Sequence, residues 1–95
     1  MTTFVIGQVT VLDPLQWEIY CSAMADTLKE WGAELTFRGR QVDTLCGRSC
    51  GSHSLVLMFP DKLSARHWFQ SIEYQGLLKM QRSAAEIDFN VFDAN

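Results

Sequence analysis

The segment Leu55–Phe59 is the feature that most constrains how this chain can fold. It is a continuous apolar run of strand length, Leu-Val-Leu-Met-Phe, without a helical period. Because side chains alternate between the two faces of a sheet, a strand of this kind must be covered on both sides. A chain of 95 residues makes about one small domain and has too little material to cover both faces. We therefore expect one domain, residues 1–95, that pairs with a second copy of itself through the sheet.

The first third of the chain predicts a strand followed by a long helix. Phe4–Leu12 is rich in β-branched residues, and we expect Gly7 to mark a bulge within that strand. Asp13 is a helix cap and Pro14 the first helical residue, and Gly32 can end the helix in a left-handed conformation. Residues at spacings of three and four form its buried stripe: Trp17, Tyr20, Met24, Leu28 and Trp31.

The middle of the chain predicts a second strand and a loop. Residues 33–37 alternate between apolar and polar, which is typical of a half-buried strand. Gly39 interrupts this pattern and Val42–Leu45 resumes a weaker extended run, so we expect a hairpin or a bulge here. Residues 46–54 contain the loop-forming residues that lead into the apolar strand.

The last third predicts helices and a closing strand. Pro60 and Asp61 begin a second helix, Ser71 caps a short third helix, and Ile87–Val91 alternates as a strand. The whole order is that of an α+β, ferredoxin-like split βαβ fold, an antiparallel sheet with helices on one face. A second copy that lays its own sheet against this one would cover the other face.

Composition excludes several classes of function. The chain has 8 Lys and Arg against 11 Asp and Glu, a net charge of −3, which argues against a nucleic-acid partner. The longest apolar run is far shorter than the roughly 20 residues of a membrane-spanning helix, and the N-terminus lacks the pattern of a signal peptide. Three cysteines are too few for a secreted disulfide scaffold, so we expect a cytoplasmic protein.

Several residues, taken in order, resemble one known family. They are Gly7-Gln8-Val9-Thr10-Val11, Asp13-Pro14 before Trp17 and Tyr20, Gly32, Phe59-Pro60, Ala65, Trp68, Ser71, Glu73-Tyr74-Gln75 and Arg82. Over nearly its whole length the chain is similar to the bacterial domain-of-unknown-function family numbered 1330, in the dimeric α/β-barrel superfamily. The resemblance implies a homodimeric ferredoxin-like fold and no particular activity. Met58 stands where family members commonly have an acidic residue, which puts in doubt any chemistry that needs a carboxylate there.

One loop contains residues of metal-ligand type. Cys46, Cys50 and His53 lie within eight residues, and zinc accepts such ligands. A structural zinc site needs four ligands, however, and no second pair follows in the sequence. We therefore expect no metal at these residues and no cofactor in the protein. Metal binding and a Cys46–Cys50 disulfide stay open as alternatives.

Tyr20, Ser71, Tyr74 and Arg82 are the candidate ligand-binding residues. Tyr20 places a hydroxyl on a buried stripe, Ser71 and Tyr74 lie at a helix start, and Arg82 follows two turns later. Together they can supply the polar groups of an apolar pocket that selects a small anion. In the alternative, Ser71 only caps, the tyrosines bond to backbone, and Arg82 pairs with an acidic neighbour.

Three functions follow from these patterns. The first is a protein that binds a small, anionic molecule between sheet and helices. The second is a dimeric interaction domain without a ligand, and the third is a cofactor-independent monooxygenase- or isomerase-like enzyme, which rests on fold analogy alone. No catalytic residue is identified, and the sequence leaves open whether the protein is an enzyme.

Overall fold

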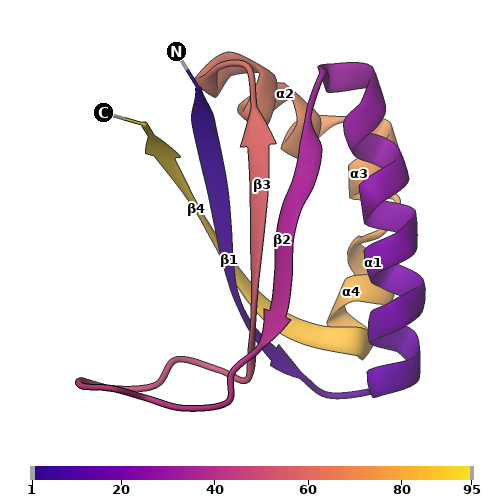
Figure 1. The fold of residues 1–95 in the computed structure, drawn as a ribbon. Helices are drawn as coiled ribbons and strands as arrows, with labels where there is room; N and C mark the ends of the chain where they lie inside the picture. Colours follow the sequence, from indigo (N-terminus) through magenta and orange to yellow (C-terminus); the bar gives the residue numbers. More distant parts are fainter. Residues whose placement is uncertain (1, 95) are drawn as a thin grey trace.

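The computed structural model describes residues 2–94 and contains one antiparallel sheet with its helices on one side (Figure 1). The elements are β1 (Thr3–Val11), α1 (Pro14–Leu28), the 3₁₀ turn η1 (Lys29–Trp31), β2 (Glu34–Arg40), β3 (His53–Phe59), α2 (Lys62–Gln70), α3 (Ile72–Gln75), α4 (Leu78–Ala84) and β4 (Ala85–Asp93). The strand order is β2-β3-β1-β4, with every neighbouring pair antiparallel. This confirms the predicted ferredoxin-like α+β fold.

The ends of α1 follow the sequence signals. The Asp13 carboxylate accepts hydrogen bonds from the backbone N–H groups of Leu15 and Gln16 at 3.1 and 3.2 Å, so this residue is a cap. After η1, Gly32 adopts φ +64°, the left-handed conformation that turns the chain into β2. Both predicted helix boundaries are therefore confirmed, with the last turn tightened into 3₁₀ geometry.

Side-chain caps also set the later helices. Asp61 accepts a hydrogen bond from the backbone N–H of Ser64 at 2.7 Å and begins α2. Ser71 accepts from the N–H of Tyr74 at 3.2 Å and begins α3. The single third helix that the sequence predicts is in fact two short helices, α3 and α4, separated at Gly76 and Leu77. None of the helices in residues 2–94 has the length and apolarity needed to cross a bilayer.

The two faces of the sheet have different surroundings. One face packs on the helices and holds the core: Val5, Val9, Leu55, Leu57 and Phe59 from the strands, with Trp17, Tyr20, Met24, Leu28, Trp68 and Tyr74 from the helices. The other, which we call the open face, carries Phe4, Ile6, Phe37, Val56, Met58 and Phe92. These six side chains are all half-buried or exposed. The chain therefore leaves the second apolar side of β3 uncovered, as the run Leu55–Phe59 predicted.

Two glycines and one segment differ from the sequence expectations. The pairing of β1 with both neighbours runs without a shift through Gly7, so the expected bulge is absent there. The irregularity in β2 lies between Leu35 and Phe37, whereas Gly39 sits inside the strand and is covered by the Phe37 ring. Val42–Leu45 forms no strand and belongs to the loop between β2 and β3. Both glycines are thus explained by an aromatic ring above them rather than by a break in pairing.

Gly7→Ala is expected to destabilise the protein by about 1–3 kcal/mol. A Cβ atom at Gly7 would lie 2.8 Å from Cε1 of Phe89, so the ring would have to move. Chemical denaturation measures the change in the free energy of unfolding. The same substitution made beside Phe89→Val should cost much less, because the clash is gone; equal costs in both backgrounds would contradict this account.

Candidate functional site

A cleft of about 330 Å³ lies between α2 and the strands β1 and β4. Most of its lining residues are apolar, and three of them are aromatic. The lining residues are Val5, Lys62, Ala65, Arg66, Trp68, Phe69, Gln70, Leu78, Gln81, Ile87, Phe89 and Val91. A small ligand would find here the apolar walls and few polar groups that are typical of binding sites.

The cleft exists because the helical layer does not fully cover β4. Along β4, the side chains of Ile87 and Phe89 are only half-buried, although they face the helical layer. Val91, next on the same face, is 51% exposed. The gap beside α2 therefore opens to solvent at the edge of the sheet.

The polar residues of α2 form one line along the cleft. Lys62, Arg66 and Gln70 recur at intervals of four residues, which places them on the same side of the helix. Two of the three are cations, and neither forms an ion pair among the residues that the structure describes. The rim therefore carries positive charge that is available to an anion.

A buried hydrogen-bond relay ends at a residue that lines the cleft. The hydroxyls of Tyr20 and Tyr74 are 2.9 Å apart, and the Tyr74 hydroxyl donates to Oε1 of Gln81 at 2.6 Å. Since Tyr74 has one proton and gives it to Gln81, Tyr20 must be the donor to Tyr74. The carbonyl oxygen of Gln81 thereby accepts a hydrogen bond from the core, and its amide N–H₂ group remains as a donor on a residue that lines the cleft.

Both tyrosines of the relay stay protonated. Burial, together with the neighbouring Tyr74, raises the pKa of Tyr20 far above its ordinary value. Burial likewise raises the pKa of Tyr74, while the hydrogen bond from Tyr20 opposes that shift. The relay is therefore a chain of neutral hydrogen bonds that orients Gln81, and neither hydroxyl is poised as a base at neutral pH.

The structure brings together three of the four candidate residues predicted from the sequence. Tyr20 and Tyr74 are in direct contact, and Ser71 caps the helix of Tyr74 while its hydroxyl donates to the carbonyl of Trp68 at 2.7 Å. Arg82 lies apart: it is exposed on α4, and its side chain has no hydrogen bond or ion pair among residues 2–94. None of the four lines the cleft, whereas Gln81 does. The pattern Lys62, Arg66, Gln70 was the sequence signal for the cleft, visible as a four-residue repeat.

The candidate metal ligands lie along the loop and at the strand start that follows it. Cys46 and Cys50 are exposed free thiols between β2 and β3. His53 begins β3, where its Nδ1 lies 2.8 Å from the Ser52 hydroxyl and its ring packs 6.2 Å from that of Trp17. Within the described part of the chain, no three His, Cys, Asp or Glu side chains gather as a metal site would require.

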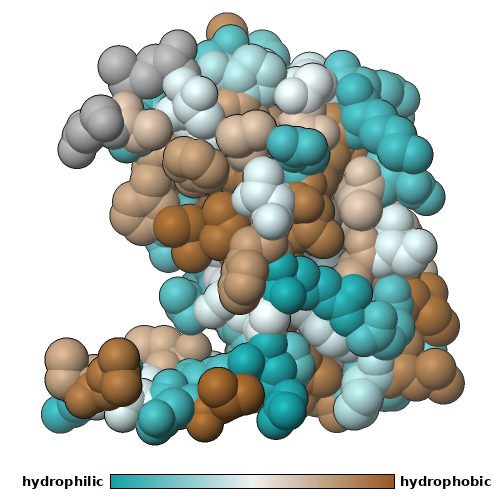
Figure 2. All heavy atoms as spheres, in the orientation of Figure 1, coloured by the Kyte–Doolittle hydropathy of each residue, from teal (hydrophilic) through white to brown (hydrophobic). Residues whose placement is uncertain are grey.

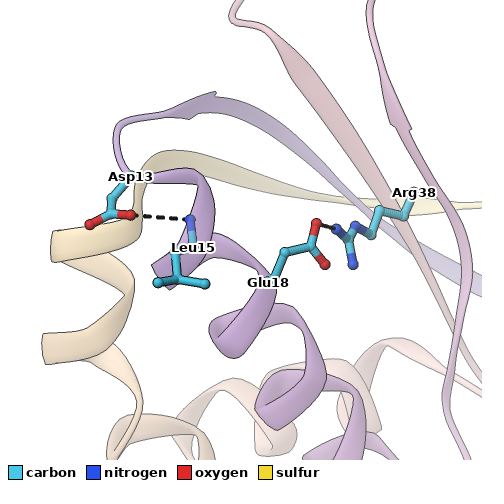
Figure 3. A network of polar contacts seen from close by, with 4 residues as sticks. All are labelled: Asp13, Leu15, Glu18 and Arg38. Atoms are coloured by element: carbon cyan, nitrogen blue, oxygen red, sulfur yellow. Dashed lines mark hydrogen bonds and ion pairs between the residues drawn. The ribbon is translucent and has the colours of Figure 1, made fainter.

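A second polar cluster joins the start of α1 to β2 (Figure 3). Arg38 reaches from the strand to form an ion pair with Glu18, and its guanidinium lies 6.0 Å from the centre of the Trp17 ring. Nearby, burial raises the pKa of the Cys21 thiol to about 11, although Arg38 opposes the shift. Cys21 is therefore a small buried hydrophobic residue, and Arg38 has its partner within the chain.

Tyr20→Phe is expected to cost about 1 kcal/mol of stability, and Tyr74→Phe about 2–3 kcal/mol. The second change is worse because it leaves both the Tyr20 hydroxyl and the Gln81 carbonyl without a partner. The double variant should cost less than the sum, since no orphaned hydroxyl remains between the rings. Urea denaturation of the four proteins measures this, and strictly additive costs would argue against the relay.

The chain matches one known protein family over almost its whole length. The model of the family described as a domain of unknown function, DUF1330, matches residues 2–95. The comparison with curated proteins gave no match.

Solved structures share the fold at low identity. A protein of unknown function from Rhodopseudomonas palustris has a TM-score of 0.80 at 11% identity, covering 99% of this chain and 82% of that one. A cofactor-independent oxygenase from Streptomyces nogalater has a TM-score of 0.71 at 15% identity, covering 99% of this chain and 92% of that one. A dimeric protein of unknown function and ferredoxin-like fold from Bacteroides fragilis has a TM-score of 0.57 at 8% identity, covering 98% of this chain and 96% of that one. These likenesses confirm the fold, and the family match over residues 2–95 decides the membership: the chain belongs to the DUF1330 family.

Proposed function

We propose that this protein binds a small anionic molecule with an apolar body in the cleft beside α2. The observation that carries this proposal is the pairing of aromatic walls with two cationic side chains, Lys62 and Arg66, on one rim. A carboxylate or similar group would meet the cations while the apolar body packs on Trp68, Phe69 and Phe89.

The remaining polar group of the cleft fits the same ligand class. Gln81 is held by Tyr74 through its carbonyl, so its N–H₂ group is the part offered to a ligand. That group donates to an acceptor oxygen, such as that of a carboxylate, carbonyl or phenolate. Tyr20 and Tyr74 thus act as positioning residues for Gln81. A volume of about 330 Å³ suits a ligand at the small end of the usual range.

Binding is better supported than catalysis. The Streptomyces structure is described as a cofactor-independent oxygenase, but the likeness to it is one of fold. Proton abstraction from a substrate needs a positioned base, and the described residues that line this cleft include no Asp, Glu or His. Binding of this kind needs no cofactor. We also propose that the protein works in the reducing cytoplasm, where the exposed Cys46 and Cys50 would remain thiols.

We also propose that the protein is a homodimer joined through its open faces. Phe4 lies beside Met58 and Phe92, and Ile6 beside Val56, so the apolar residues of three strands form one surface. A surface of this kind is expected to be buried by association. The Bacteroides structure of similar fold is described as dimeric, which supports the same arrangement here.

The ligand proposal predicts that some aromatic carboxylates raise the melting temperature of the protein, by about 5 °C or more at saturation. Arg66→Leu should weaken the response about tenfold in ligand concentration, because a charge-assisted contact is lost. Arg82→Leu is the matched control, since it removes the same charge from outside the cleft. Loss of the response in Arg82→Leu alone would favour the site predicted from the sequence. No response to any carboxylate in the wild type would refute both.

The dimer proposal predicts twice the mass of the 10.8 kDa chain in light scattering at micromolar concentration. Val56→Asp should give monomers, because it puts a charge into the open face. Leu63→Asp changes an exposed leucine on the helical side and should leave the mass unchanged. A wild-type monomer would overturn the proposed association.

A further inference from the structure

The loop between β2 and β3 projects away from the body of the protein. We call this segment, Gln41–Ser52, the arm. Figure 1 shows that it extends from the lower end of the sheet on the side opposite α1, which is the side of the open face. A second copy of the chain placed on the open face would therefore lie next to this segment.

The base of the arm is tied firmly to the sheet. The N–H of Gln41 donates to the carbonyl of Ser52 at 2.8 Å, and the N–H of Ser52 donates to that of Val9 at 2.6 Å. The Ser52 hydroxyl also accepts from the N–H of Val11 at 3.2 Å. Farther out, side-chain hydrogen bonds join Gln41 to Thr44 and to Ser49. The arm thus leaves the sheet in a defined direction.

The arm carries apolar side chains that nothing in the single chain covers. Val42 is 82% exposed and Leu45 is 96% exposed, the largest exposures among the aliphatic side chains of the sheet and its loops. Figure 2 shows hydrophobic side chains both along the arm and over the body above it, with a hollow between them. Two apolar surfaces facing one hollow are what an inserted partner would bury.

We propose that the arm clasps a second copy of this chain, with Val42 and Leu45 packing on the partner subunit. This inference rests on the proposed dimer and adds a second contact surface to it. A copy seated on the open face lies on the arm's own side of the sheet, so it comes within reach of the arm. Two-fold symmetry makes the contact reciprocal, with each arm lying along the other chain. This contact explains why a mostly polar loop carries two highly exposed aliphatic side chains.

The test measures the dimer dissociation constant by sedimentation equilibrium. Val42→Ser with Leu45→Ser should raise it at least tenfold, because two buried side chains lose apolar contact. Leu63→Ser with Ile72→Ser is the matched control: it removes two exposed aliphatic side chains from the helical side and should leave the constant unchanged. Circular dichroism confirms that each variant is folded. An unchanged constant in the arm variant, or an equal rise in the control, overturns the clasp.

Cross-linking from the arm gives a second measurement. In a Cys50→Ser variant, Cys46 is the exposed thiol among the described residues, while Cys21 is buried and stays protonated. A maleimide-benzophenone attached to Cys46 should, on illumination, join two chains in high yield at concentrations where the dimer forms. Cross-links confined to one chain in a proven dimer overturn the clasp and leave the open-face dimer standing. A wild-type protein that is monomeric at every concentration would overturn both the open-face dimer and the arm contact.

Discussion

The helices of the described chain all lie on one side of the sheet and do not cover that side completely, and both the cleft and the open face follow from this arrangement. The 15-residue α1 and the 9-residue α2 bury one face of β1 and β3, but on β4 they leave Ile87 and Phe89 half-buried and Val91 exposed. No helix in the described chain covers the open face. One consequence is a cleft between α2 and β4. The other is an apolar sheet surface that is left exposed to solvent in the single chain. Ligand binding and association are thus proposed at separate places.

The buried tyrosine relay connects the core to the cleft. Two hydroxyls in a core this small carry a cost unless they are bonded, and each finds its partner in the other or in Gln81. The Trp68 ring lies 4.4 Å from that of Tyr74 and fixes its position. Because the relay ends at the Gln81 carbonyl, it fixes the partner of that oxygen and holds a side chain that lines the cleft. Core packing therefore orients a group that a ligand would touch.

Much of the fold could be predicted from the sequence because its signals are local. The caps at Asp13 and Ser71 and the left-handed Gly32 each depend on a few neighbouring residues. The errors arose where a distant residue decides. Gly7 was expected to mark a bulge, and only the position of Phe89 on another strand explains why it is glycine. The stripe of α1 identified Tyr20 as a buried hydroxyl, but its partner lies 54 residues away in the chain.

The sequence by itself determined the order of the elements, the buried faces, and the apolar strand that needs cover on both sides. Those properties come from periodicity and capping, which act over a few residues. Only the tertiary structure decided which polar groups share a cleft: it placed Lys62 and Arg66 with Gln81 and left Arg82 outside. It also decided that the arm projects on the side of the open face. Such relations depend on how strands pair and how helices cross them, and no local pattern encodes the distance between α2 and β4.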